Sequence, residues 1–188
     1  MKSMVLYSAE MKHSAETVKK FTLLQYNTFE WWRKGLLLLL SAALILFGIS
    51  VHSPIPMILC LFAGCFLLTN INSRASSVAD GVIEAMKGSF PHLTYSFTES
   101  GFSDGEDRPT VPYKNLYRLI SDEQYLYLFI SKASGYMIDR TTVQGEGGPE
   151  GLMKLLSEKS GLSWTKPFSL LTFNLYSFRS GQGLRKKR

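Results

Sequence analysis

Two long apolar runs, separated by a short break, dominate the pattern of hydrophobic and polar positions in this chain. Residues 35–51 and residues 55–71 each form a run of 17 positions without a charged side chain. A helix needs about 20 apolar residues, with a lower limit of about 17, to cross the hydrocarbon core of a bilayer. The first run is apolar on every side, whereas a helical hairpin inside a soluble protein keeps a polar face toward water. The pattern therefore predicts a transmembrane helical hairpin, and the alternative is a buried hairpin of a soluble protein.

The residues that precede the first run are typical of a membrane interface. We expect an interfacial anchor made of two indoles and two cations, namely Trp31, Trp32, Arg33 and Lys34. Indoles favour the headgroup zone, and cations favour the water and phosphate beyond it. The alternative is a tryptophan pair that packs on the soluble part of the chain.

The positions of the cations around the hairpin predict its orientation. The break between the runs, residues 52–54, carries no Lys or Arg, whereas the flanks carry several: Arg33, Lys34, Arg74 and Lys87. Cytoplasmic segments of membrane proteins are enriched in Lys and Arg. The chain is therefore expected to be a multi-pass protein of a cytoplasmic membrane, with both termini in the cytoplasm.

Shorter amphipathic segments lie on both sides of the hairpin. Alternation over residues 4–11 predicts a strand. A helix is expected to follow from the N-cap Ser14 to Trp32, with Glu16 in the first turn, where the helix dipole favours an anion. We interpret residues 76–90 as a juxtamembrane amphipathic helix, because apolar side chains recur there four positions apart: Val78, Val82, Met86 and Phe90. The alternative for this last segment is a simple connector.

Beyond Pro91 the apolar pattern changes to a period of two, which is typical of β-strands. Strands are predicted over six segments: residues 94–98, 102–103, 110–113, 115–120, 124–131 and 135–139. Both faces of residues 124–131 are apolar, so this strand is expected in the centre of a sheet. Gly148 as cap and Pro149 in the first turn predict a helix that ends near Lys159. Strands followed by a single helix predict a domain of the α+β class.

The chain is accordingly expected to have five parts. These are an N-terminal strand and amphipathic helix (1–34), a two-helix transmembrane hairpin (35–71), a juxtamembrane helix (72–90), a cytosolic antiparallel β domain with a C-terminal helix (91–165), and an apolar and basic tail (166–188). The tail is an edge strand, an interfacial segment or a solubilising end, and its composition does not choose among the three.

The net charge of +6 at pH 7 adds a preference for anionic partners. Beside a membrane hairpin, anionic lipid is a simpler explanation of this charge than nucleic acid. The candidate lipid-contacting residues are cations of the β domain and of the C-terminal end: Lys114, Arg118, Lys132, Arg140, Arg185, Lys186, Lys187 and Arg188. Each cation held at an anionic bilayer contributes about 1 kcal/mol.

Residue patterns typical of catalysis or metal binding are not found in the sequence. The three histidines, His13, His52 and His92, lie in separate segments without metal-ligand spacing to Cys or carboxylates. Cys60 and Cys65 are five positions apart in one predicted helix, where their side chains do not face one another, so no disulfide is expected. No serine lies in a G-x-S-x-G elbow. We therefore predict no catalytic residue, no cofactor and no metal site.

Two remaining clusters are interpreted as structural. Asp104, Glu106 and Asp107 fall in a predicted turn, where a solvated acidic loop is favoured over an acid–base pair or a Ca²⁺ site. Residues 145–148 are rich in glycine but lack the Lys-Ser/Thr of a P-loop, so a chain break is favoured over a phosphate cradle. Neither apolar run contains the charged residue that ion pathways usually need. An enzyme or a small transporter is therefore disfavoured.

Four segments of the β domain carry a resemblance to a known family. They read YSFTESGF (95–102), VPYKNLY (111–117), YLYLF (125–129) and GYMIDR (135–140). With the preceding hairpin, they resemble the bacterial YcxB-like membrane proteins. Where that family often has Pro-Lys/Arg after the last strand, this chain has Asp139-Arg140. The resemblance implies a bacterial membrane protein whose C-terminal domain is similar to a pleckstrin-homology-like (PH-like) barrel or half-barrel, and it implies no catalytic residues.

The expected function is that of an integral membrane protein whose cytosolic β domain acts as a membrane-tethered interaction or regulatory module. The alternative is an immunity-type membrane protein that neutralises a cognate toxin, and an enzyme or small transporter is the disfavoured third reading. The expected partners are membrane lipids and an unidentified protein, which is the toxin in the second reading. Self-association is left open, and nucleic acid is not expected.

Overall fold

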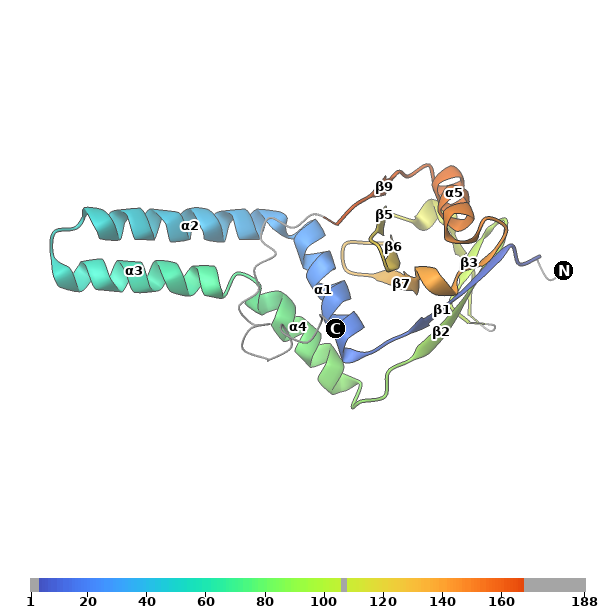
Figure 1. Cartoon of the computed structure of the whole chain (residues 1–188), viewed down its shortest axis with the longest axis horizontal. Helices are drawn as coiled ribbons and strands as arrows, with labels where there is room; N and C mark the ends of the chain where they lie inside the picture. Colours follow the sequence, from blue (N-terminus) through green and yellow to red (C-terminus); the bar gives the residue numbers. More distant parts are fainter. Residues whose placement is uncertain (1–3, 106–107, 168–188) are drawn as a thin grey trace, which may run out of the picture. The chain divides into compact units, whose positions relative to one another are not determined.

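The structure, a computed structural model, describes residues 4–105 and 108–167 (Figure 1). These residues form two compact units. The helical unit comprises residues 22–82, and the β unit comprises residues 4–21 together with the described residues between 83 and 167. The described helices are α1 (Ala15–Phe29), α2 (Trp31–Ser50), α3 (Pro54–Thr69), α4 (Ser73–Ala85) and α5 (Gly148–Ser160). With two largely antiparallel sheets, they confirm the predicted α+β class.

The two apolar runs form a helical hairpin. Figure 1 shows α2 and α3 lying side by side, joined by a short turn. Pro54 lies in the first turn of α3, where its missing N–H costs no hydrogen bond. The predicted break between the runs is therefore the turn of the hairpin.

The helix that precedes the hairpin begins as predicted and ends earlier. The Ser14 Oγ accepts a hydrogen bond from the Thr17 N–H (3.3 Å), and the Thr17 Oγ1 accepts one from the Ser14 N–H (2.8 Å). This reciprocal pair confirms Ser14 as the N-cap of α1. The prediction that the helix reaches Trp32 was wrong, because the backbone leaves the helical conformation at Glu30 (ψ 21°) and α2 starts at the next residue.

The helix after the hairpin also differs from its prediction. It was expected over residues 76–90, but α4 begins earlier and ends at Ala85. Its buried residues are Ala75 and Ala79, whereas Val78 and Val82 are exposed. Small side chains form the packed face, so the recurrence of larger apolar residues indicated the wrong side. Gly88 (φ 78°) follows in the left-handed conformation that is common after helix ends.

One sheet of the β unit combines strands from before and after the hairpin. Its order is β4-β3-β2-β1-β8. The strands are β1 (Tyr7–Lys12), β2 (His92–Phe97), β3 (Gly101–Ser103), β4 (Val111–Pro112) and β8 (Gln144–Gly145). Antiparallel pairing of β1 with β2 runs from Tyr7↔Phe97 to Lys12↔His92. The N-terminal strand is therefore held inside the sheet, between β2 and β8.

The second sheet has the order β7-β6-β5-β9. Its strands are β5 (Arg118–Ser121), β6 (Tyr125–Phe129), β7 (Gly135–Asp139) and β9 (Trp164–Thr165). The expected central place of the strand in 124–131 is confirmed, since β6 pairs on both sides and buries its last four residues. The parallel partner of β5, β9, was not predicted, because two residues are too few to show a period.

The connection between the sheets corrects two strand predictions. A single turn of 3-10 helix, η1 (Tyr113–Asn115), follows β4, so the segments 110–113 and 115–120 are not continuous strands. The Tyr113 hydroxyl donates to the Thr98 carbonyl at 2.6 Å and holds this turn against the first sheet. Burial of the hydroxyl raises the pKa of Tyr113, which therefore stays a neutral donor.

The predicted acidic loop is only partly exposed to solvent. The side chain of Asp104 is 10% exposed and accepts a hydrogen bond from Arg108 Nη1 at 2.6 Å, so it is paired rather than solvated. Glu106 and Asp107 lie outside the described residues.

The glycine-rich segment 145–148 leads into α5 one residue earlier than expected. Gly147 (φ 75°), and not Gly148, is the cap of this helix. The Tyr7 hydroxyl donates to the Glu146 carbonyl at 2.7 Å, so the loop is tied to β1. Leu152 and Leu156 of α5 are fully buried. Together with the aromatic residues of β2, β3 and β6, they form the core of the β unit.

Candidate functional site

The hairpin contains one helix that meets the requirements for a membrane span by itself. Among the described helices, α2 is the one that is long and apolar enough to cross a membrane alone. The α3 helix has 16 residues and reaches the required length only when it is joined to α4, across a bend of 45°. By length and composition, α2 is thus one candidate span. If the bent pair of α3 and α4 forms a single span, there are two candidates.

The contact between α2 and α3 is made by small residues. The Ser41 hydroxyl is fully buried and donates to the Gly64 carbonyl at 2.8 Å. A Cβ atom added at Gly64 would lie 2.6 Å from Ile45 Cγ1, and one added at Gly48 would lie 3.0 Å from Cys60 Cβ. The two glycines therefore permit a close approach of the backbones that a larger side chain would prevent.

Large apolar side chains point away from this contact. Leu39 is 74% exposed and Phe62 is 70% exposed, near the middle of α2 and α3 respectively. Other exposed apolar residues of the hairpin are Leu36, Leu40, Leu46, Phe47, Ile49, Ile55, Ile58, Leu59 and Phe66. Apart from Lys34, the fully buried residues of α2 and α3 are thus small (Ser41, Gly48 and Gly64), whereas many of the large apolar residues are exposed.

The four predicted anchor residues do not share one environment. Trp31 and Trp32 are exposed, and Arg33 donates to Glu30 Oε2 at 3.1 Å. Lys34 is only 2% exposed: its ammonium donates to Asn27 Oδ1. The ammonium also lies 5.2 Å from the centroid of the Tyr26 ring. Lys34 is therefore turned into the helical unit, whereas the two indoles lie on its surface.

The predicted lipid-contacting cations of the β unit separate into two groups. Arg118 begins β5 opposite Phe129, and Lys132 lies in the turn that follows β6, so both occupy one end of the second sheet. Lys114 is exposed on η1, shortly before this end. Arg140 follows β7 at the opposite end of the sheet. Arg185, Lys186, Lys187 and Arg188 lie outside the described residues.

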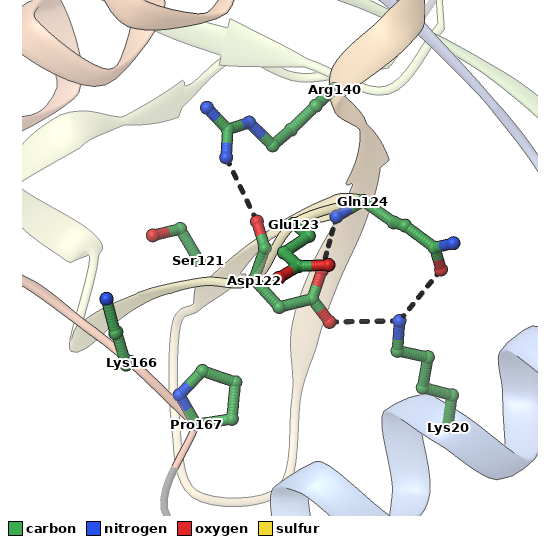
Figure 2. A pocket seen from close by; sticks show the side chains of 8 residues that line it. All are labelled: Lys20, Ser121, Asp122, Glu123, Gln124, Arg140, Lys166 and Pro167. Carbon is green, nitrogen blue, oxygen red and sulfur yellow. Dashed lines mark hydrogen bonds and ion pairs between the residues drawn. The ribbon is translucent and has the colours of Figure 1, made fainter.

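Arg140 lines an open pocket at the β5–β6 turn (Figure 2). The pocket has a volume of about 670 Å³ and lies entirely in the β unit. Its lining residues are Lys20, Ser121, Asp122, Glu123, Gln124, Arg140, Lys166 and Pro167. They come from α1, from the turn between β5 and β6, from the end of β7 and from the segment after β9. Four separate stretches of the chain therefore meet here.

Asp122 organises one side of the pocket. Its Oδ1 accepts the N–H groups of Gln124 (2.8 Å) and Tyr125 (2.7 Å), and its Oδ2 accepts the Tyr127 hydroxyl (2.9 Å). The Lys20 ammonium lies 3.0 Å from the same Oδ2. Burial raises the pKa of this carboxyl, but the hydrogen bonds outweigh burial, and the net pKa is below the ordinary value of 3.8. Asp122 is therefore an ionised group whose acceptor positions are already used.

Arg140 is fixed on the other side. Its Nη1 donates to the Asp122 carbonyl at 3.0 Å, and its Nη2 donates to Glu150 Oε1 at 2.5 Å. Figure 2 draws the Ser121 hydroxyl and the Lys166 ammonium on the same side of the turn as this guanidinium, away from the pair of Lys20 and Asp122. Within the part of the chain that the structure describes, no residue accepts a hydrogen bond from Lys166, which lines the pocket.

Of these pocket residues, only Arg140 had been singled out from the sequence. Lys20 lies within the predicted helix that begins at Ser14, and Asp122 lies between the predicted strands 115–120 and 124–131. The turn at Asp122 has a local signal, because Asp side chains commonly accept backbone N–H groups two residues further on. Its meeting with Lys20 and Arg140 has no such signal. Lys166 carried no local signal, because its position depends on β9.

Comparisons with known proteins show no family for the chain. No family model, curated protein or solved structure matches it. The resemblance to the YcxB-like proteins, and the unidentified protein or toxin partner, therefore stay predictions. Within the described ranges, no group of three or more His, Cys, Asp or Glu side chains could hold a metal ion.

Proposed function

We propose that the protein is an integral membrane protein in which the α2–α3 hairpin holds the β unit at the inner surface of a bacterial cytoplasmic membrane. In this proposal the β unit acts as an interaction or regulatory module. The observation that carries the proposal is the inverted packing of the hairpin, with Ser41 and Gly64 inside and residues such as Leu39 and Phe62 outside.

The inverted packing is favoured in lipid and disfavoured in water. Burial of a Leu or Phe side chain is worth about 1.5–3 kcal/mol in water, which a water-exposed hairpin would forgo at each outward position. Lipid tails are as apolar as these side chains, so in a bilayer helices associate through close packing and interhelical hydrogen bonds. The hydrogen bond from Ser41 to Gly64 is such an interhelical bond, and the glycines permit the close packing of the two backbones.

The pairing of β1 with β2 supports two crossings rather than one. The β1 strand precedes the hairpin in sequence and β2 follows it, yet they form one ladder of six residue pairs. Strands that pair must lie on the same side of a membrane, so the chain between them crosses an even number of times. If α2 spans the bilayer, α3 must return through it. With 16 residues and a rise of about 1.5 Å per residue, α3 would need local thinning of the bilayer or extension by flanking residues.

The β unit supplies the water-facing part of this proposal. Its two sheets and the C-terminal helix α5 support a PH-like half-barrel, although the parallel pairing of β5 with β9 adds a strand to that plan. Arg118, Lys132 and Lys114, near one end of the second sheet, are the cations proposed to contact anionic lipid. The absence of Lys and Arg from the hairpin turn supports a cytoplasmic β unit.

A charge placed on the outer face of α2 tests the membrane proposal. In a bilayer, Leu39→Arg would disfavour insertion by about 2.5–3.5 kcal/mol, because the side chain lies near the centre of the span. On a water-exposed surface, the same change would alter stability by no more than about 0.5 kcal/mol. When membranes are washed with carbonate, we expect the wild-type protein to remain in the membrane fraction. The Leu39→Arg variant should be released from it.

The matched control is Val5→Arg, at an apolar residue that is 51% exposed in the β unit. It should behave as the wild type. Recovery of the wild type in the soluble fraction, or equal behaviour of Leu39→Arg and the wild type, would overturn the proposal.

Cysteine labelling tests the two crossings and the orientation. In a background without Cys60 and Cys65, Ser53→Cys places a thiol in the hairpin turn and Ser163→Cys places one on the exposed surface of the β unit. A membrane-impermeant maleimide added to intact cells should label the first and not the second. Labelling of the second alone would reverse the orientation, and labelling of both would exclude the hairpin.

A further inference from the structure

The pocket at the β5–β6 turn offers hydrogen-bond donors that the β unit itself does not use. The guanidinium of Arg140 has five N–H donors, and the described contacts use two of them. The Lys166 ammonium and the Ser121 hydroxyl add further donors on the same side of the turn (Figure 2). A pocket that presents donors from three separate segments is suited to a ligand with several acceptor oxygens.

The acidic groups of the pocket do not make it a cation site. Both oxygens of Asp122 already accept two bonds each, from backbone N–H groups, from Tyr127 and from Lys20. Its charge is balanced by the Lys20 ammonium, which also lies 4.4 Å from the centroid of the Tyr125 ring. The lining thus contains three cations and two carboxylates, and Arg140 also pairs with Glu150, which does not line the pocket.

The donors are held in place before any ligand arrives. The Arg140 guanidinium is fixed by hydrogen bonds to the Asp122 carbonyl and to Glu150. The backbone N–H of Arg140 donates to the Gln124 carbonyl at 2.9 Å. Lys166 directly follows β9, which is paired with β5. Planar guanidinium groups bind phosphate oxygens through parallel hydrogen bonds, and preorganised donors lose less entropy on binding.

We propose that this pocket binds a phosphate-bearing anion through the Arg140 guanidinium, the Lys166 ammonium and the Ser121 hydroxyl. The pocket volume of about 670 Å³ is larger than a bare phosphate needs, so the ligand carries an organic group as well. The phosphate belongs either to the headgroup of a lipid or to a soluble phosphorylated compound. The inference goes beyond the proposed function, because a soluble ligand would bind whether or not the hairpin spans a membrane.

The test uses the full chain in nanodiscs of phosphatidylcholine. Glycerol 3-phosphate and inorganic phosphate are titrated, with calorimetry as the readout, against the wild type and two charge-matched variants. Lys166→Gln removes a cation of the pocket, and Lys159→Gln removes an exposed cation of α5 that does not line it. We expect saturable binding of glycerol 3-phosphate that Lys166→Gln weakens about tenfold, as for loss of one charge-assisted hydrogen bond, and that Lys159→Gln leaves unchanged.

A third variant predicts the opposite sign. Glu123→Gln removes the nearby negative charge without removing a donor, so it should strengthen binding of the same probe. A gain with Glu123→Gln and a loss with Lys166→Gln cannot both result from a general loss of folding.

A second arm replaces a third of the lipid by phosphatidylglycerol and measures hydrogen exchange at residues 118–125. The lipid headgroup is the source of the phosphate if the soluble probes do not bind and this lipid protects the turn from exchange in the wild type. The protection should then persist in Lys159→Gln and be lost in Lys166→Gln. The proposal is overturned if neither arm shows an effect, or if Lys166→Gln and Lys159→Gln weaken binding equally. Carbonate extraction tests membrane insertion independently, so failure of one proposal does not decide the other.

Discussion

The hairpin and the β unit sort their side chains in opposite ways. In the β unit, Phe102 and Leu128 are fully buried and the charged residues lie outside. In the hairpin, Ser41 and Gly64 are inside, and Leu39 and Phe62 lie outside. Removal of apolar surface from water drives the first arrangement, whereas close backbone approach and an interhelical hydrogen bond hold the second. One chain therefore contains two parts that pack in opposite ways, and the proposed membrane span accounts for the second.

The largest expected difference concerns aromatic truncation. Phe102 stacks on Phe97 with ring centroids 5.6 Å apart, in the centre of the β unit. Phe102→Ala should destabilise this unit by about 3–5 kcal/mol, because it removes buried apolar surface and leaves a cavity. Denaturant titration of the detergent-solubilised chain measures the change, with Trp164 as the remaining fluorophore after Trp31→Phe and Trp32→Phe.

The matched control for aromatic truncation is Phe62→Ala, which truncates an exposed ring of α3. It should leave the unfolding of the β unit unchanged. If both substitutions lowered the unfolding free energy equally, the hairpin and the β unit would not differ in how they pack aromatic side chains.

Glycine substitution tests the other half of the comparison. Gly64→Leu places a side chain where even a Cβ would lie 2.6 Å from Ile45 Cγ1, and it should destabilise the hairpin by about 2–3 kcal/mol. Gly35→Leu is the control, because nothing lies within 4 Å of a Cβ at that position. Helix loss during titration with a denaturing detergent, followed by circular dichroism, measures both. If both variants lose helix at the same concentration of denaturing detergent, the glycine contact does not hold α2 against α3.

The two regions also differ in how far the sequence predicts them. The hairpin is predictable from composition, since long uncharged runs and a Ser-Pro break are local signals. The alternating strands β1, β6 and β7 are predictable for the same reason. The packed face of α4 was not predictable from the sequence. Its buried residues are Ala75 and Ala79, and alanine gives no clear hydrophobic period.

The candidate site was less predictable than the fold. Arg140 could be named from the sequence as a candidate anion-contacting cation, but its neighbours Lys20 and Lys166 are far from it in sequence. They meet because α1 packs beside the second sheet and because β9 adds to β5. Lys34 shows the converse: its place beside two indoles predicted an exposed anchor, and a tertiary contact with Asn27 buries it.

The smallest expected effect is at the turn of the pocket, where the partly buried carboxylate of Asp122 pairs with Lys20. Asp122→Asn keeps the shape of the side chain but removes the charge that Lys20 and Tyr127 contact, and it should cost about 1–2 kcal/mol at pH 7. Because the pKa of Asp122 is lowered by folding, its contribution is present above the unfolded value of 3.8. The contribution is lost as the pH falls through the lower, folded pKa.

The difference in unfolding free energy between the wild type and Asp122→Asn should therefore be constant from pH 7 to about pH 5 and shrink below about pH 4. Glu123→Gln, a charge-removing change at the exposed neighbour, should alter stability by no more than about 0.5 kcal/mol at pH 7. A difference that persists unchanged at pH 3 would show that Asp122 acts through the shape of the turn and not through its charge.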